Sequence, residues 1–154
     1  MNEDVSRINN VKRNPARIRA LVRSYAKNIS STAKITTIAA DMTENDLTLA
    51  EKTIGGCLNA LIRIHLIEDV PAWNLALRSR TALTATPKRH FTDPSIAVVM
   101  LASNHKPLLK DFKTFGLLFE SLVVRDLRIY SQALGVELFH YRDKNGLEAD
   151  GVSI

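Results

Sequence analysis

The stretch NPARIRALVRSYAKN, residues 14–28, opens the part of the chain in which apolar side chains recur at helical spacing. Asn14 followed by Pro15 is typical of a helix N-cap with proline at the first helical position. These features predict a first helix near 15–28. Its apolar face would consist of Ile18, Leu21, Val22 and Tyr25.

Two further helices and a strand pair follow the first helix. Apolar residues at helical spacing predict helices near 34–42 and 49–64, and Thr48 with Glu51 forms the pattern of a capping box before the latter. The segment 75–92, rich in Thr and Leu, predicts a strand pair. Three short helices followed by a small hairpin is the layout of a winged helix-turn-helix.

The second half of the chain also mixes helices and strands. It predicts a short helix near 93–101 and a long helix near 108–134, which Gly135 would end. A strand over 136–141 and a returning strand over 147–154 would form a hairpin, because they flank an Asn-Gly pair. The whole chain is therefore predicted to be α+β.

The composition permits a folded protein of modest size. The chain has 154 residues, of which 45% are hydrophobic and 24% charged, close to the globular average. The longest apolar run, 96–102, is too short to span a membrane, and the acidic start does not match an export signal. With Cys57 as the single cysteine, no intramolecular disulfide can form. We therefore expect a cytoplasmic protein without a membrane partner.

Basic residues concentrate near the start of the chain. The first 34 residues contain eight basic and two acidic side chains, within a net charge of +5 for the whole sequence. Arg19, Arg23 and Lys27 are four positions apart and line one stripe of the first helix, opposite its apolar face. Such a stripe could follow the phosphates of a nucleic acid.

Two further regions could contribute to nucleic-acid binding. Arg78 and Arg80, together with Lys88 and Arg89, would form a second basic cluster in the hairpin. The third helix offers only Lys52, Thr53 and Asn59 as readers of base edges, which argues against sequence-specific recognition. The alternative interpretation is an ordinary solvated surface on a fold that serves protein contacts.

Carboxylates in the second half are candidates for metal-assisted chemistry. Glu120 and Asp126 both lie among apolar neighbours on the long helix, and spacing alone does not choose between them. Glu148 and Asp150 alternate onto one face of their strand, so either could point at a metal. The alternative is that the two helix acids pair with arginines of the same helix or are exposed.

Four motifs stand in order along the chain and indicate a family resemblance. They are PAWN (71–74), PKRHFTDPSIA (87–97), FGLLFESLVVRDL (115–127) and FHYRDKNGLEADGV (139–152). With these motifs the chain resembles the C-terminal half of a family of bacterial and archaeal AAA-type ATPases, in which a winged helix precedes a PD-(D/E)XK nuclease-like module, the domain of unknown function 4143. The resemblance implies a winged-helix domain over 14–92 and a partial nuclease-like module over 93–154.

The resemblance assigns roles to two of the acids, and the chain also differs from the family pattern. It makes Glu120 and Asp150 the inherited catalytic and metal-binding positions, with magnesium as the metal. The ATPase core, its phosphate loop and the family's Glu-x-Lys strand are missing, and Lys144 in the hairpin turn is misplaced to supply the lysine. The resemblance therefore implies a truncated protein with an incomplete hydrolytic site.

These observations lead to two functional expectations. The first is a non-enzymatic binding or regulatory fragment, without a cofactor, that contacts nucleic acid or a protein partner. The alternative is a magnesium-dependent nuclease completed by a partner chain or a homodimer. Because the strand at 147–154 would lie at a sheet edge, a homodimer through that edge is also expected.

Four other residues receive structural interpretations. Cys57 lies on the apolar face of the third helix and is expected in the core, and Trp73 is expected at a core edge. His90 and His140 adjoin aromatic residues in predicted strands and are expected to be structural rather than metal ligands.

Overall fold

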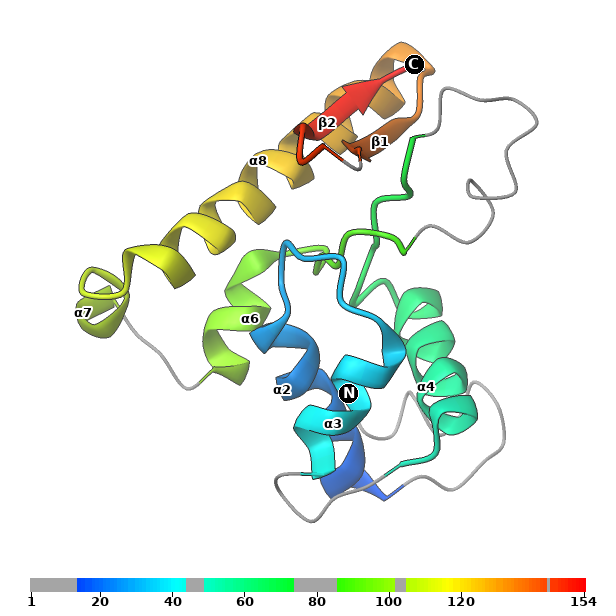
Figure 1. Cartoon of the computed structure of the whole chain (residues 1–154), viewed down its shortest axis with the longest axis vertical. Helices are drawn as coiled ribbons and strands as arrows, with labels where there is room; N and C mark the ends of the chain where they lie inside the picture. The colour runs from blue at the N-terminus through cyan, green and yellow to red at the C-terminus, as the bar shows by residue number, and fades with distance from the viewer. Residues whose placement is uncertain (1–13, 44–48, 74–85, 102–104, 144) are drawn as a thin grey trace.

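The computed structural model describes residues 14–43, 49–73, 86–101, 105–143 and 145–154, except for the side chains of His105 and Lys106. Helices α2, α3, α4 and α6 gather at one end of the molecule, and a long helix, α8, leads away from them (Figure 1). A two-stranded antiparallel sheet lies along the far half of α8. The fold is therefore α+β, as predicted.

Helix α2 (Pro15–Lys27) forms as the sequence predicts. The Asn14 side chain accepts a hydrogen bond from the backbone N–H of Ala16 at 2.9 Å, which caps the first turn. The expected apolar residues are buried, and the buried face also includes Ser24 and Ala26. Ser24 donates to the backbone oxygen of Ile38 at 3.1 Å and so fastens α2 to the next helix.

Helices α3 (Ile35–Thr43) and α4 (Glu51–Arg63) complete the N-terminal group. Helix α4 does not begin with the predicted capping box. Ala50 occupies its N-cap position, and the alanine side chain has no hydrogen-bond acceptor. Thr48 itself lies outside the described residues. Both helices direct apolar residues into the same core as α2.

Extended segments connect the two halves of the molecule. Antiparallel bridges join Ile67 to Phe91 and Val70 to Lys88, and a parallel bridge joins Ala72 to His140. The segment near residue 70 therefore lies between the segment 88–91 and the first strand of the C-terminal sheet. Most of the predicted strand pair over 75–92 lies outside the described residues.

Helix boundaries in the second half follow local caps. Helix α6 (Pro94–Met100) begins after Asp93, whose carboxylate accepts from the N–H of Ser95 at 2.8 Å. A short helix, α7 (His105–Leu108), precedes α8 (Phe112–Leu134). The long helix starts later than predicted, because Asp111 caps it by accepting from the N–H of Thr114 at 3.1 Å. It ends, as predicted, before Gly135, whose φ of 70° is left-handed.

The predicted C-terminal hairpin is present. Strand β1 (Leu138–Arg142) pairs antiparallel with β2 (Glu148–Ser153), with an irregular register between Phe139 and Tyr141. The loop between the strands is longer than a two-residue turn. It is held by the Asp143 carboxylate, which accepts hydrogen bonds from the N–H groups of Asn145 and Leu147, both at 2.8 Å. This loop still requires Gly146, which has a φ of 85°.

The main core continues across the predicted domain boundary at residue 92. It combines apolar residues of α2, α3 and α4 with Phe91, Ala97 of α6 and Leu118 of α8. A smaller cluster of Val70, Val124 and Leu138 lies between the extended segment, α8 and β1. In the part of the chain that the structure describes, no helix has the length and apolar character needed to cross a bilayer.

Candidate functional site

The two acids chosen by the family resemblance both contact one buried lysine. The Lys88 ammonium nitrogen, Nζ, is 2.7 Å from Glu120 Oε1 and 2.6 Å from Asp150 Oδ1. Glu148 Oε1 lies 3.2 Å from the same nitrogen. We name Lys88, Glu120, Glu148 and Asp150 the lysine–carboxylate cluster. Residues from a strand-like segment, a helix and the C-terminal hairpin meet there.

The fold explains why these side chains converge. The bridge to Val70 fixes the backbone of Lys88 beside α8. On that helix, Glu120 lies two residues after the first buried residue, Leu118. On β2, Glu148 and Asp150 are two residues apart and share one face. Helix α8 packs against this strand, which brings the three acids to one point.

The cluster corrects the interpretation of Lys88 as part of an exposed basic cluster. Only 3% of its side chain is exposed, whereas Asp150 at 54% and Glu148 at 38% are partly hydrated. A lysine becomes buried in this way when acids surround its charge. The cluster is therefore closed on the lysine side and open to solvent on the side of β2.

Burial and charge act in opposite directions on the pKa values of the cluster. Burial alone would lower the pKa of Lys88, but the hydrogen bond to Asp150 and the charges of Asp150 and Glu120 outweigh it and raise that pKa above its ordinary value. Burial raises the pKa of Glu120, and the charges of Asp150 and Glu148 add to this effect. At neutral pH the lysine is a cation that donates hydrogen bonds to Glu148 and Asp150. It forms an ion pair with Glu120, whose buried Oε1 accepts no hydrogen bond.

This arrangement already places a cation among the carboxylates. Among the described residues, no group of three or more His, Cys, Asp or Glu side chains has the geometry to hold a metal ion. A divalent ion bound by Glu120 and Asp150 would have to displace the ammonium group from between them. The alternative helix acid, Asp126, pairs instead with Arg125 at 2.9 Å.

Two buried histidines lie near the cluster. His90 Nδ1 is 3.2 Å from the hydroxyl of Ser121, and burial together with the charges of Arg128 and Lys88 lowers the pKa of His90 to about 3. Burial also lowers the pKa of His140, whose Nε2 lies 3.3 Å from the backbone oxygen of Thr86. Both imidazoles are neutral and packed inside, which agrees with the structural interpretation.

A second buried ion pair was not anticipated from the sequence. Arg89 forms a salt bridge with Asp69, and the side chain of Arg89 is only 7% exposed. Tyr25 donates its hydroxyl to the same carboxylate and also lies 3.2 Å from the backbone oxygen of His90. Arg89, like Lys88, is therefore unavailable to a phosphate. Nothing in the spacing of these residues indicates their pairing.

The predicted stripe of α2 is exposed. Arg19, Arg23 and Lys27 all lie on the solvent side of the helix. Within the described residues, no salt bridge involves any of the three. Their charges are thus available to an anionic partner. On α4, the side chains of Lys52, Thr53 and Asn59 are also exposed, whereas Arg78 and Arg80 lie outside the described residues.

Comparison with known proteins identifies one family. A domain of unknown function, DUF8612, matches residues 1–106. The chain belongs to this family. No curated protein and no solved structure matches the chain.

The DUF8612 segment contains α2, α3, α4 and α6, and it supplies Lys88 to the cluster. Glu120, Glu148 and Asp150 come from the part of the chain beyond this segment. The cluster therefore connects the DUF8612 segment to α8 and the C-terminal hairpin through charged contacts. These contacts add to the apolar contacts of the main core.

Two other residues of the DUF8612 segment occupy the places expected from the sequence. Cys57 is buried on the inner face of α4, within the main core. Trp73 is partly buried and contacts the Tyr141 ring edge-to-face, with a distance of 5.8 Å between ring centroids. Trp73 therefore packs beside the C-terminal hairpin.

Proposed function

We propose that this protein is a non-enzymatic module that binds nucleic acid through the basic stripe of α2. The observation that carries the proposal is the exposure of Arg19, Arg23 and Lys27 without a salt bridge in the described ranges. Positions four residues apart on a helix are separated by about 6 Å along its axis. A straight row of cations at this spacing suits successive phosphates and carries no base preference.

The arrangement of the elements supports a winged-helix interpretation of the first half. Helices α2, α3 and α4 precede antiparallel bridges that join residues near 67–70 to residues near 88–91. In that interpretation α4 would be the recognition helix. Its few polar, exposed residues favour contact with the backbone of a nucleic acid over reading of its sequence.

The relation to C-terminal regions of AAA-type ATPases belongs to the same proposal. Its support is the convergence of Glu120 and Asp150, which the resemblance singles out from the other acids. In this proposal the cluster is a structural remnant that connects α8 to β2. Nucleic-acid contact would then belong to α2, at a separate place on the molecule.

Removing two charges of the stripe should weaken binding. We expect the double variant Arg19→Ala, Arg23→Ala to bind a fluorescent DNA duplex at least about tenfold more weakly at low salt. The slope of log affinity against log salt should fall by about two, since two phosphate contacts are lost. Fluorescence anisotropy titrations at several salt concentrations measure both quantities.

A matched variant controls for the change in net charge. Lys110→Ala, Lys113→Ala removes the same charge from exposed positions just before and within the first turn of α8. This variant should bind almost as well as the original chain. Absence of binding at low salt, or equal losses in both double variants, would contradict the proposed role of the stripe. A protein target would then become the better interpretation.

A second candidate function is metal-dependent phosphodiester hydrolysis. The observation that favours it is a lysine beside two acids in a single chain, because Lys88 supplies the cation that we expected to be missing. In this function Glu120 and Asp150 would hold magnesium only after the Lys88 ammonium group had moved away from them, and Lys88 would then be placed to orient a water molecule. No partner chain is needed to supply the lysine in this arrangement.

Incubation with plasmid DNA separates the two functions. A nuclease would cut the plasmid with Mg²⁺ or Mn²⁺ and would lose this activity in Glu120→Gln and in Asp150→Asn. Our proposal predicts an intact plasmid under the same conditions, although the protein binds it. Metal-dependent cutting that both variants abolish would overturn the non-enzymatic proposal.

A further inference from the structure

Helix α8 is apolar on two opposite faces. One face is buried against the rest of the molecule through Leu118, Ser121, Val124 and Ser131. A surface helix of a globular protein normally has polar residues on the face opposite its buried one. The opposite face of α8 is exposed but largely apolar. Its large apolar residues are Phe112, Phe115, Phe119, Val123, Leu127, Tyr130 and Leu134. Leu127 is the least exposed of them at 37%, because its side chain also lies against Gly151 of β2.

The exposed face is large enough to form a stable interface. Phe112 is 76% exposed, Tyr130 62% and Leu134 78%. With about 150–250 Å² for a whole aromatic side chain, the face offers about 700 Å² of apolar surface. The largest apolar patch of a typical monomer measures about 300–600 Å². A standard interface covers about 800 Å² on each partner.

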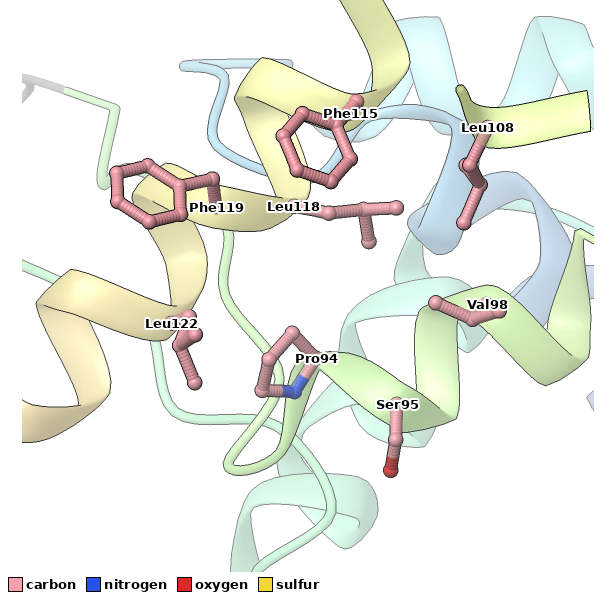
Figure 2. A pocket seen from close by; sticks show the side chains of 8 residues that line it. All are labelled: Pro94, Ser95, Val98, Leu108, Phe115, Leu118, Phe119 and Leu122. Carbon is pink, nitrogen blue, oxygen red and sulfur yellow. The ribbon is translucent and has the colours of Figure 1, made fainter. Parts of the chain in front are cut away.

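The face continues into a groove between α6, α7 and α8. Phe115 and Phe119 also line this groove, which has a volume of about 250 Å³ (Figure 2). Leu108 of α7 and Val98 of α6 are among the other lining residues, and nearly all of them are apolar. The apolar surface of α8 therefore extends sideways onto its two neighbouring helices.

Helical spacing places three pairs of uncharged residues of this face at equal distances on either side of Val123, whereas Phe115 has no exposed counterpart, because Ser131 is buried. Counted outward from Val123, the paired residues are four, seven and eleven positions away in each direction. A symmetric stripe suits an antiparallel pair of identical helices related by a two-fold axis, since each residue then meets its counterpart on the other side of the centre. The positions are Phe112, Gly116, Phe119, Val123, Leu127, Tyr130 and Leu134.

We infer that two copies of this chain associate through antiparallel contact of their α8 helices, centred on Val123. Val123 would contact Val123 of the second copy. Phe119 would contact Leu127 of the second copy, and Phe112 would lie against its Leu134. Each contact occurs twice, because a two-fold interface uses the same surface on both partners.

Gly116 provides a place for the largest exposed ring of the face. A Cβ atom added to Gly116 would have no other atom within 4 Å, so the surface there is open. In the antiparallel arrangement, Tyr130 of the second copy lies opposite Gly116. A small residue opposite a large one lets two helices approach closely, in the manner of interlocking side chains at a helix pair.

The charges of α8 agree with this arrangement. None of the seven positions of the stripe is charged. Asp126 borders the stripe, but Arg125 binds its carboxylate at 2.9 Å and neutralises it within one protomer. Glu120 borders the stripe on its other edge, and its carboxylate pairs with Lys88 at 2.7 Å. The interface would therefore bury no unpaired charge of these acids.

The oligomeric state of the whole chain tests the inference. Sedimentation equilibrium should give twice the chain mass of 17.2 kDa at micromolar concentration. Phe119→Lys and Val123→Lys should each raise the dimer dissociation constant at least a hundredfold. Val99→Lys should leave the dimer unchanged, since Val99 is an equally apolar, exposed residue (69%) on α6, outside the stripe. Circular dichroism checks that all three variants remain folded.

Two more variants test the position of the two-fold axis. Val123→Cys should form a disulfide-linked dimer on mild oxidation, whereas Val99→Cys should not, and the natural Cys57 is buried. Gly116→Leu should weaken the dimer by filling the space expected for Tyr130. A monomeric original chain would overturn the inference. A dimer that persists in both Phe119→Lys and Val123→Lys would also overturn it. That result is expected if the two copies associate through the edge of β2.

Discussion

Replacing Lys88 with methionine is expected to lower the free energy of unfolding by about 3 kcal/mol at pH 7. The substitution keeps an unbranched side chain that is one heavy atom shorter, but it leaves Glu120, Glu148 and Asp150 without their shared cation. We place the loss at the lower end of values for broken buried pairs, because Asp150 is half-exposed and can regain water. Urea titration followed by circular dichroism measures the difference.

A surface lysine gives the matched control. Lys110→Met removes the same charge from an exposed position, and the free energy of unfolding should change by no more than about 0.5 kcal/mol. If Lys88→Met were equally mild, the lysine–carboxylate cluster would contribute little to stability. The connection of the DUF8612 segment to α8 and the C-terminal hairpin would then rest on the other contacts, which include the apolar core, the Ala72–His140 bridge and the salt bridge between Arg128 and Glu68.

The pH dependence of the Lys88→Met variant follows from the acids that remain. The pKa of Glu120 is already above 4.5, the value for an exposed glutamate, and it rises further when Lys88 is absent. A folded state with the higher pKa binds the proton more tightly than the unfolded chain, so stability increases as pH falls through that pKa. The difference in free energy of unfolding between the original chain and the Lys88→Met variant should therefore become smaller as the pH falls from 7 to 4.5. A constant difference would argue against repulsion between the acids.

The second large effect is expected at Asp69. Asp69→Ala should lower the free energy of unfolding by about 3 kcal/mol, because it leaves the buried Arg89 guanidinium without its counter-charge. It also removes one hydrogen-bond partner of Tyr25. Burial raises the pKa of Tyr25 well above its ordinary value, so the hydroxyl remains a donor throughout the usual pH range. Thermal and urea denaturation of the variant measure the loss.

Two further substitutions separate the charge from the hydrogen bond. Tyr25→Phe removes only the hydroxyl and should cost about 1 kcal/mol. Adding Arg89→Met to Asp69→Ala should recover part of the stability, since the unpaired charge disappears. If Asp69→Ala cost no more than Tyr25→Phe, the ion pair with Arg89 would be of minor importance.

The sequence predicted those elements whose ends depend on local chemistry. Asn14 with Pro15 starts α2, and Gly135 follows the end of α8 at a left-handed φ. The hairpin at Gly146 was also predicted, because few residues tolerate that backbone conformation. The start of α8 was predicted four residues too early, at 108 instead of Phe112, since Asp111 caps the helix through a side-chain hydrogen bond that the apolar pattern does not reveal.

The sequence did not reveal which charged residues are buried. Lys88 and Arg89 appeared to form a basic surface, because their partners Glu120, Asp150 and Asp69 are distant in the chain. Only the pairing of extended segments brings them together. Residue patterns left Asp126 and Glu148 open as candidates, and the structure places Glu148 at the cluster. The apolar pattern of α8 likewise predicted a helix without indicating that one face is exposed.

An NMR titration with a short DNA duplex, in low salt and with Mg²⁺ present, tests the central claim most directly. We predict shifts in amide signals around Arg19, Arg23 and Lys27 of α2, while the duplex remains intact. Signals near Glu120 and Asp150 should not move. Unchanged signals along α2, or shifts confined to those two acids together with cleavage of the duplex, would contradict the account.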